Sequence, residues 1–289
     1  MGRGDPTNAE WERLESFLPP GGARGGRWSD HQRVINGVLY RVRTGVQWRD
    51  LPERFGPWET VYKRHRRWSA DGTWTMFLSR IQAAEDAAGR IDWEVSGTRP
   101  PCVPTSMPPA RGRHLRTPIF KRGTFGGEPG RSGAAQADGP ARGSGQIGEC
   151  LGRSRGGFTT KIHLAADGRC RPLALVLTPG HYGDGPQLER VLEQVSVPRP
   201  KVGRPRTRPD HVLADKAYTS RSNRRYLRRR GGRPTGFDSE RYKKRSTEDI
   251  ERAINRLRGF RAVATRYEKG ACIYLGTVTL AALIIWLRT

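Results

Sequence analysis

The run FTTKIHLAADGRCRPLALVLT, residues 158–178, contains two apolar segments separated by a short polar one. Phe158 to Ala166 and Pro172 to Thr178 are rich in residue types that favour strands, and Ala-Asp-Gly at 166–168 is typical of a turn. We therefore expect a β-hairpin here, and this hairpin decides how the neighbouring segments are interpreted.

The segments that follow the hairpin alternate between helical and strand patterns. Asp184 is placed to cap a helix that reaches about Gln194, and the apolar segment His211 to Ala214 predicts a short strand that ends at Asp215. Two more helices are expected, from about Ser220 to Arg230 and from about Asp249 to Phe260. This alternation predicts an α/β fold with a mixed sheet and flanking helices.

The N-terminal region has helical patterns only. Ser29 and Gln32 form a possible capping box, apolar residues then recur at helical spacing, and Gly45 is placed to end that helix. A second helix, roughly Glu59 to Ser69, combines an apolar stripe with the cations Lys63, Arg64, Arg66 and Arg67. That pattern fits a helix that docks on DNA and fits equally a structural helix with a solvated basic face.

The overall composition is strongly basic. Lys and Arg number 53 against 28 Asp and Glu, which gives a net charge of +25 and a pI near 11.1. This excess argues against an ordinary metabolic enzyme and favours a polyanionic partner, above all nucleic acid. The cysteines Cys102, Cys150, Cys170 and Cys272 form no Cys-x-x-Cys pair, so they argue against a zinc site and fit the reducing cytoplasm.

Two segments depart from this basic, mixed composition. Ala271 to Leu287 is apolar but slightly short for a membrane span, so we expect a buried C-terminal element. Residues 97–150 are rich in Gly, Pro, Arg and Ser without periodicity, which indicates a linker or a disordered insert.

Three residues of the C-terminal half suggest chemistry. Asp215 follows an apolar strand, Glu251 lies on the last amphipathic helix before the apolar segment, and Arg258 stands two helical turns after Glu251. Two carboxylates and a cation can hold divalent metal and phosphate. The alternative is a helix-capping aspartate and a surface glutamate paired with arginine.

The surrounding motifs point to one family. They are Trp-Arg-Asp-Leu-Pro-Glu-Arg-Phe-Gly-Pro-Trp at 48–58, Leu-Gly-Arg-Ser-Arg-Gly-Gly at 151–157, Thr-Lys-Ile-His-Leu-Ala-Ala-Asp-Gly at 160–168, Leu-Thr-Pro-Gly at 177–180, Val-Leu-Ala-Asp-Lys-Ala-Tyr at 212–218, Glu-Arg-Ala-Ile-Asn-Arg-Leu at 251–257 and Ala-Thr-Arg-Tyr-Glu-Lys at 264–269. Together they resemble the insertion-sequence-five group of DDE transposases, which have an RNase H-like catalytic fold. The resemblance covers most of the chain outside 97–150.

The resemblance implies roles for individual residues. Asp215 would be the second and Glu251 the third metal-binding carboxylate, with Mg²⁺ or Mn²⁺ as the cofactor. Arg258 stands where the family usually has Lys and would contact phosphate. Tyr242 and Arg245 match the Tyr and Arg that precede the family glutamate and would lie at the DNA; their spacing leaves Glu248 as a weaker candidate for the third carboxylate.

The first catalytic aspartate of the family is missing. Ile91-Asp92-Trp93-Glu94-Val95-Ser96 matches the family strand, but Gly97-Thr98-Arg99 follows instead of an Asp-Ser-Thr sequence. Asp92 is no substitute, because it lies at the beginning of that strand.

A shifted reading frame offers an explanation for the missing aspartate. A permitted codon choice for residues 97–111, read from its third base, spells Asp-Ser-Thr-Ala-Val-Arg-Ala-His-Gln-His-Ala-Ala-Gly-Ala. We hypothesise that residues 97 to roughly 145 are translated out of frame; the alternative is a natural disordered insert. A second departure follows Arg230, where the family's next short strand is absent, so the sheet is expected to be incomplete.

The expected organisation has four parts: a helical DNA-binding domain at 1–88, the first catalytic strand at 89–96, the insert at 97–150 and the RNase H-like domain at 151–289. The function implied is DNA transposition by a cytoplasmic, nucleoid-associated homo-oligomer that binds terminal inverted repeats and target DNA in a synaptic complex. We expect this copy to be catalytically inactive. The alternatives are a non-catalytic DNA-binding protein derived from a transposase and an RNA-binding or ribosome-associated basic protein.

Overall fold

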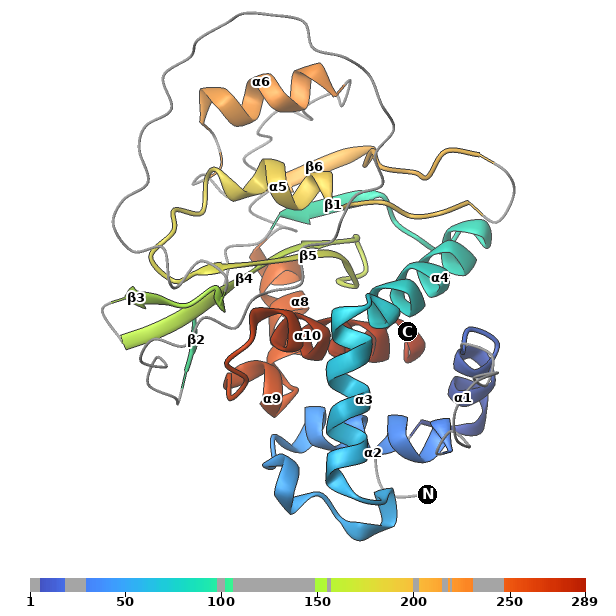
Figure 1. Ribbon diagram of the computed structural model, residues 1–289. Helices are drawn as coiled ribbons and strands as arrows, with labels where there is room; N and C mark the ends of the chain where they lie inside the picture. The colour runs from blue at the N-terminus through green and yellow to red at the C-terminus, as the bar shows by residue number, and fades with distance from the viewer. Residues whose placement is uncertain are drawn as a thin grey trace, which may run out of the picture.

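The computed structural model describes residues 6–18, 30–97, 102–105, 149–154, 157–199, 203–214, 218, 220–230 and 247–289 (Figure 1). Its α-helices are α1 (Asn8–Glu15), α2 (His31–Thr44), α3 (Trp58–Ala70), α4 (Thr73–Ala87), α5 (Gln187–Glu193), α6 (Arg221–Arg229), α8 (Thr247–Arg258), α9 (Arg261–Ala264) and α10 (Ala271–Leu287). Two 3₁₀ turns, η1 (Trp48–Asp50) and η2 (Glu53–Phe55), join α2 to α3. The strands are β1 (Glu94–Gly97), β2 (Cys102–Pro104), β3 (Gly152–Ser154), β4 (Gly157–Ala166), β5 (Pro172–Pro179) and β6 (His211–Ala214).

The predicted hairpin forms the centre of the sheet. β4 and β5 pair antiparallel from Thr160 opposite Pro179 to Ala166 opposite Pro172, which confirms both strands within one residue at each end. Along its other edge β4 pairs antiparallel with β1 and β2. β6 pairs parallel with β1, so the described sheet is mixed, as the α/β pattern predicts.

The N-terminal helices agree with their sequence signals except at one cap. The side chain of Asp30 caps α2 by accepting the N–H groups of Gln32 and Arg33, whereas Ser29, the expected cap, lies outside the described residues. Gly45 ends α2 with φ of +71°, as predicted, because a left-handed residue without Cβ is needed there. A Cβ at Gly45 would also lie 2.9 Å from Cβ of Arg261.

Two further expectations need correction. Asp184 does not cap α5, which begins after Pro186; its carboxylate instead accepts a hydrogen bond from Nζ of Lys161 at 2.7 Å. Within 97–150, Gly97 belongs to β1, and Cys102–Pro104 forms β2 because Val103 is buried against the sheet. Residues 106–148 lie outside the described part of the chain.

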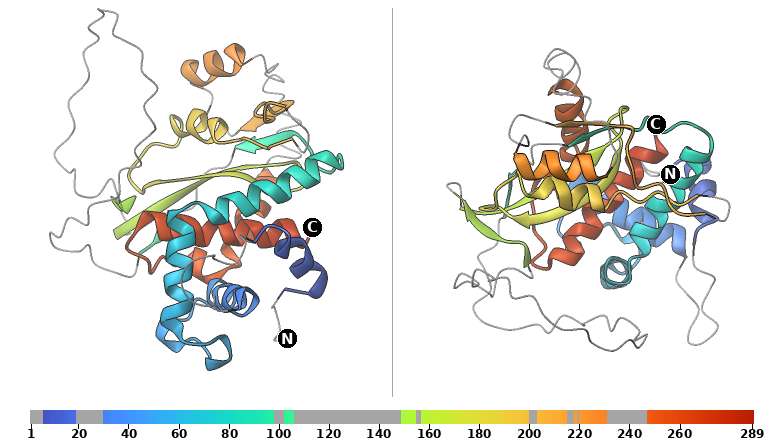
Figure 2. Two further views of the ribbon diagram at one scale, coloured as in Figure 1. Left: turned by 45° about the vertical axis from the view of Figure 1, so that its right-hand side comes forward. Right: turned by 90° about the horizontal axis from the view of Figure 1, so that it is seen from above.

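The sheet separates two layers of helices. Figures 1 and 2 show α5 and α6 on one face and α4, α8 and α10 on the other. α10 packs against α3, α4 and β5, and its side chains from Thr277 to Leu287 are all buried, which confirms the predicted buried C-terminal element. No helix among the described residues is long and apolar enough to cross a membrane.

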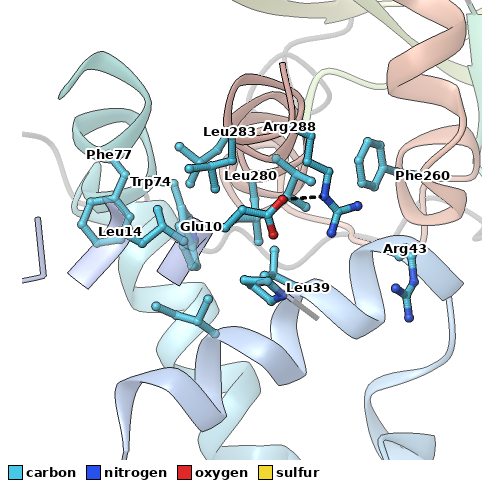
Figure 3. Close-up of a pocket in the computed structure, with 14 residues that line it drawn as sticks. Glu10, Leu14, Leu39, Arg43, Trp74, Phe77, Phe260, Leu280, Leu283 and Arg288 are labelled. Atoms are coloured by element: carbon cyan, nitrogen blue, oxygen red, sulfur yellow. Dashed lines mark hydrogen bonds and ion pairs between the residues drawn. The ribbon is translucent and has the colours of Figure 1, made fainter. Parts of the chain in front are cut away.

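The first helix, α1, packs against α4 and the last helix, α10. Leu14 of α1 faces Trp74 and Phe77 of α4 and Leu280 of α10, and the Glu10 carboxylate accepts a hydrogen bond from Nε of Arg288 at 3.1 Å (Figure 3). The space left between these side chains is only about 10 Å³, which is close to the size of one water molecule. The N-terminal helices therefore share one hydrophobic core with the C-terminal helix.

A buried arginine joins the helical layer to the hairpin. The guanidinium of Arg171 donates from Nε and Nη2 to Asp167, from Nη2 to the carbonyl of Arg90 at 2.6 Å, and from Nη1 to Glu85 of α4 at 3.5 Å. Its Cζ atom also lies 4.0 Å from the ring centre of Trp286 on α10. The beginning of β5 is thereby fixed to α4 and α10 at once.

We predict that Asp167→Asn destabilises the protein by about 3–5 kcal/mol, because removing one partner leaves a buried guanidinium short of negative charge. Urea unfolding followed by circular dichroism measures this change. Asp210→Asn is the matched control: Asp210 pairs with Arg206 at the surface, with its side chain 64% exposed, so the loss there should stay within about 0.5 kcal/mol. Equal losses in the two variants would contradict the role given to Arg171.

Two buried histidines make stability depend on pH. Nδ1 of His65 accepts the indole N–H of Trp74, so its Nε2–H donates to Oγ1 of Thr277; burial lowers the pKa of His65 to about 3. His163 of β4 bonds Oγ1 of Thr178, and burial lowers its pKa to about 4. Both rings are neutral in the folded chain and take up protons on unfolding below about pH 6.5.

The contribution of these two histidines to the free energy of unfolding should therefore be fully present above pH 6.5 and should decrease as the pH falls toward 4. At pH 5 each histidine is expected to contribute a loss of about 2 kcal/mol relative to pH 7, since the unfolded state then binds the extra proton. Urea midpoints at the two pH values test this, with His65→Gln as the variant that keeps both hydrogen bonds without titrating. If His65→Gln shows the same pH dependence as the original chain, the assignment to His65 is wrong.

Candidate functional site

Two strand ends meet at one edge of the sheet. β1 and β6 run parallel with Glu94 opposite His211 and Gly97 opposite Ala214, so both chains leave the sheet on the same side. The carboxyl ends of parallel strands are where α/β sheets present functional side chains. The next residues, Thr98 and Asp215, lie outside the described part of the chain, so the structure places the strand ends but not the predicted aspartate.

Gly97 faces the α5 side of the sheet. A Cβ built at Gly97 would lie 2.8 Å from Cδ1 of Leu188 and 3.9 Å from Cβ of Ala214. A side chain at this position would point toward α5, and the end of the Leu188 side chain would have to move to make room for it. Asp92 precedes β1 at the strand's other end, where its carbonyl accepts the N–H of Gly168 at 3.2 Å.

The helix α8 carries the other predicted residues. It packs against β1 and β4, with Ala253 and Leu257 buried, and Nη1 of Arg256 donates to the carbonyl of Arg169 at 3.2 Å. Glu251 and Arg258 are both exposed on α8. Seven residues apart on a helix, they share one face, as expected from the sequence.

The described residues do not complete a metal site. No group of three His, Cys, Asp or Glu side chains among them could hold a metal ion, and Glu251 is the only predicted carboxylate ligand whose side chain the structure describes. Asp215, Tyr242 and Arg245 lie outside these ranges, and the side chain of Glu248 is not described. The position after Gly97 holds Thr98, which has no charge to offer a divalent ion.

The four basic side chains of the predicted DNA-docking helix differ in their exposure. Lys63, Arg66 and Arg67 of α3 are exposed, opposite the buried face formed by Val61, His65 and Trp68. Arg64 is half-buried: its Nη1 lies 3.1 Å from Nδ1 of His31, its Cζ lies 5.2 Å from the ring centre of Trp68, and burial lowers its pKa. Arg64 therefore helps to attach α2 to α3, whereas the other three are presented to solvent.

The sequence interpretation missed a second basic surface and a structural arginine. α6 exposes Arg221, Arg224, Arg225, Arg228 and Arg229, a run that is visible in the sequence but was assigned only to a helix. Arg266, in the motif at 264–269, is buried and donates to the carbonyls of Glu149, Glu268 and Lys269. It ties the segment before α10 to residues 149–150, and no local signal distinguishes it from a surface arginine.

Comparison with known families bears on both halves of the chain. Residues 7–78 match a family model described as "Putative transposase of IS4/5 family", and residues 137–283 match one described as "Transposase DDE domain". No solved structure matches the chain.

Two similar proteins are also named as transposases of insertion sequences. A Brucella ovis protein named "Putative transposase for insertion sequence element IS6501" is 35% identical over 144 residues, which are 45% of this chain and all of that protein. A Burkholderia cepacia protein named "Putative transposase for insertion sequence element IS402" is 33% identical over 138 residues, or 44% of this chain and 63% of the relative.

The model of the DDE domain spans more than half of the chain, and the Brucella ovis relative is matched over its full length. The match to the DDE model, residues 137–283, includes β4 to β6 and the helices α5, α6 and α8 in a mixed α/β structure. This chain therefore belongs to the DDE transposases of insertion sequences.

Proposed function

We propose that this protein binds the terminal inverted repeats of its insertion sequence and that its DDE site, in this copy, lacks the first carboxylate. The observation that carries the proposal is the parallel register of β1 and β6, with Gly97 opposite Ala214. In that register, the two strands end side by side at one edge of the sheet. The residues that follow them in the sequence are Thr98 and Asp215, one uncharged and one acidic.

The fold supports an RNase H-like assignment for the catalytic part. β5, β4 and β1 form an antiparallel succession, and β6 extends it as a parallel neighbour of β1. We assign residues 1–88 to DNA binding and 89–96 with 151–289 to the catalytic fold. The N-terminal helices rest on α10 of that catalytic part, so the two regions act as one packed body.

Strand alternation indicates which position the missing carboxylate would occupy. Gly97 faces α5, so a residue that continues β1 would face the opposite side of the sheet, where α8 carries Glu251. Position 98 is therefore the expected place for the first carboxylate, and in the codon choice described above the aspartate of the shifted frame is spelled across codons 97 and 98.

Asp215, Glu251 and Arg258 remain the proposed site residues, and Tyr242 and Arg245 remain proposed DNA contacts. Mg²⁺ or Mn²⁺ is the cation that such a carboxylate set would hold, but with Thr98 in place the set is incomplete. We therefore propose that DNA binding is retained and cleavage is lost. A non-catalytic, transposase-derived DNA-binding protein is the second candidate function, and the missing carboxylate is what favours it.

Repeat binding should depend on the exposed face of α3. Changing Lys63, Arg66 and Arg67 together to Gln is expected to weaken binding to a duplex that carries the element's terminal repeat by at least tenfold, since each cation on a phosphate releases counterions. Fluorescence anisotropy with the repeat and with a scrambled duplex measures affinity and specificity.

The matched control removes the same charge elsewhere, with Arg80, Arg169 and Arg204 changed to Gln; these three side chains are also exposed. If the control weakens binding as much as the α3 variant, only the total charge matters. If the unchanged chain binds the repeat no better than the scrambled duplex, repeat recognition is not a property of this chain.

Cleavage of repeat-bearing DNA by the purified chain should be undetectable with Mg²⁺ or Mn²⁺, because a carboxylate is missing from the set. A denaturing gel of end-labelled substrate checks this. Robust cleavage that disappears in Asp215→Ala would refute the proposed inactivity.

The Thr98→Asp variant tests the same proposal by restoring a carboxylate at position 98. This variant is expected to bind Mn²⁺ at least tenfold more tightly than the unchanged chain in isothermal titration calorimetry, since a carboxylate is a preferred ligand of hard cations. Thr98→Asn is the control of equal size without the charge. An equal gain in the two variants would place the first carboxylate elsewhere.

A further inference from the structure

α6 has an unusually one-sided distribution of charge. Its sequence, Arg-Ser-Asn-Arg-Arg-Tyr-Leu-Arg-Arg at 221–229, contains five arginines and no acidic residue. All five arginines are exposed, whereas Asn223 and Tyr226 are buried. At 100° per residue, Arg221, Arg225 and Arg228 lie within about 60° of one another, directly opposite Asn223 and Tyr226. We call the exposed side of these five arginines the α6 arginine face.

The buried side fixes the direction of this face. Nδ2 of Asn223 donates to the carbonyls of Gly185 at 2.9 Å and Tyr218 at 3.0 Å. Nη1 of Arg230 donates to the carbonyl of Leu192 at 3.0 Å and to the hydroxyl of Tyr226 at 2.8 Å. The helix is thereby attached to α5 and to the residues before it, and the arginine face is directed away from the described part of the protein.

The arginines of α6 repel one another. Arg221 and Arg225, and Arg225 and Arg229, are four residues apart, a spacing that brings like charges together on a helix surface. No acidic residue within the helix offsets this repulsion. A polyanion that lies along the helix would relieve it, and the span from Arg221 to Arg229, about 12 Å, is long enough to contact several phosphates of one duplex.

The α6 arginine face is distinct from the basic face of α3. Figures 1 and 2 show α6 beyond one face of the sheet and α3 beyond the other, with α5, the strands and α4 or α10 between them. α6 follows β6 in the chain, with residues 215–220 between them. Repeat recognition is assigned to α3.

We propose that the α6 arginine face binds the phosphate backbone of duplex DNA without reading its sequence, as a second DNA surface separate from α3. The inference rests on the proposed function, since it presumes that DNA is the partner. Phosphate contacts position a duplex, whereas base contacts specify its sequence. The two surfaces should therefore differ in how their loss affects specificity.

The test changes Arg221, Arg225, Arg228 and Arg229 together to Gln in the full chain. Affinity for the repeat duplex and for a scrambled duplex is measured by fluorescence anisotropy between 50 and 300 mM NaCl. The expected result is an equal weakening for both duplexes, by at least tenfold at about 0.1 M salt, and a salt slope smaller by about three to four. An Arg→Lys variant at the same four positions should keep most of the slope, because it keeps the charge.

The control changes Arg80, Arg169, Arg204 and Arg208 to Gln, which removes the same charge from exposed positions elsewhere. If the α6 variant and this control behave alike, the α6 face is not a DNA surface, while repeat binding through α3 still stands. If the unchanged chain binds neither duplex, the proposed function itself fails. A loss confined to the repeat, or a stronger effect on an RNA hairpin than on duplex DNA, would also overturn the assignment; thermal unfolding of each variant shows that the fold is intact.

Discussion

The position of the sheet relative to the helices depends on one buried guanidinium. Arg171 precedes β5 and contacts Asp167 in the hairpin turn, Glu85 of α4 and the ring of Trp286 on α10. Burying a charge is unfavourable unless hydrogen bonds and opposite charges surround it, and here two carboxylates and a carbonyl do so. Gln82 and Trp286 then donate to the carbonyl of Pro172, so the first residue of β5 is held by both helices.

This junction has a consequence at the far end of β1. The turn between β4 and β5 receives Arg171 on one side and contacts Asp92 on the other, through the N–H of Gly168. Asp92 opens the segment that becomes β1, and the parallel register of β1 with β6 follows from there. The network of arginine and carboxylates thus lies at the beginning of the segment whose other end, Gly97, meets Ala214, and none of its members is proposed to touch DNA.

Local patterns in the sequence predicted the elements that depend on local physics. The β4–β5 hairpin, the glycine that ends α2 and the buried α10 follow from strand alternation, a left-handed backbone and an apolar run. Interactions between distant segments were not predictable in that way. Asp184 has the residue type of a cap but pairs with Lys161 across the hairpin, and Arg171 and Arg266 look like surface cations until the fold buries them. For the site, the sequence indicated the strand end after Ala214 and the exposed face of α8. It could not indicate that position 97 faces α5, because that depends on how α5 packs on the sheet.

A missing carboxylate is compatible with an intact fold for an electrostatic reason. Carboxylates gathered at one edge repel one another unless a cation neutralises them, so a functional set of three is held together at some expense of stability. On the proposed function, an uncharged threonine after Gly97 would remove part of that repulsion, while the residues that position the edge, from Arg171 to the β1–β6 ladder, stay in place. Loss of the metal set would then be separable from loss of the fold, and also from loss of DNA binding. The exposed cations of α3 lie on a helix whose buried face is anchored through His65, which bonds Thr277 of α10 and not the strand ends. α6 is anchored through Asn223 to the carbonyls of Gly185 and Tyr218.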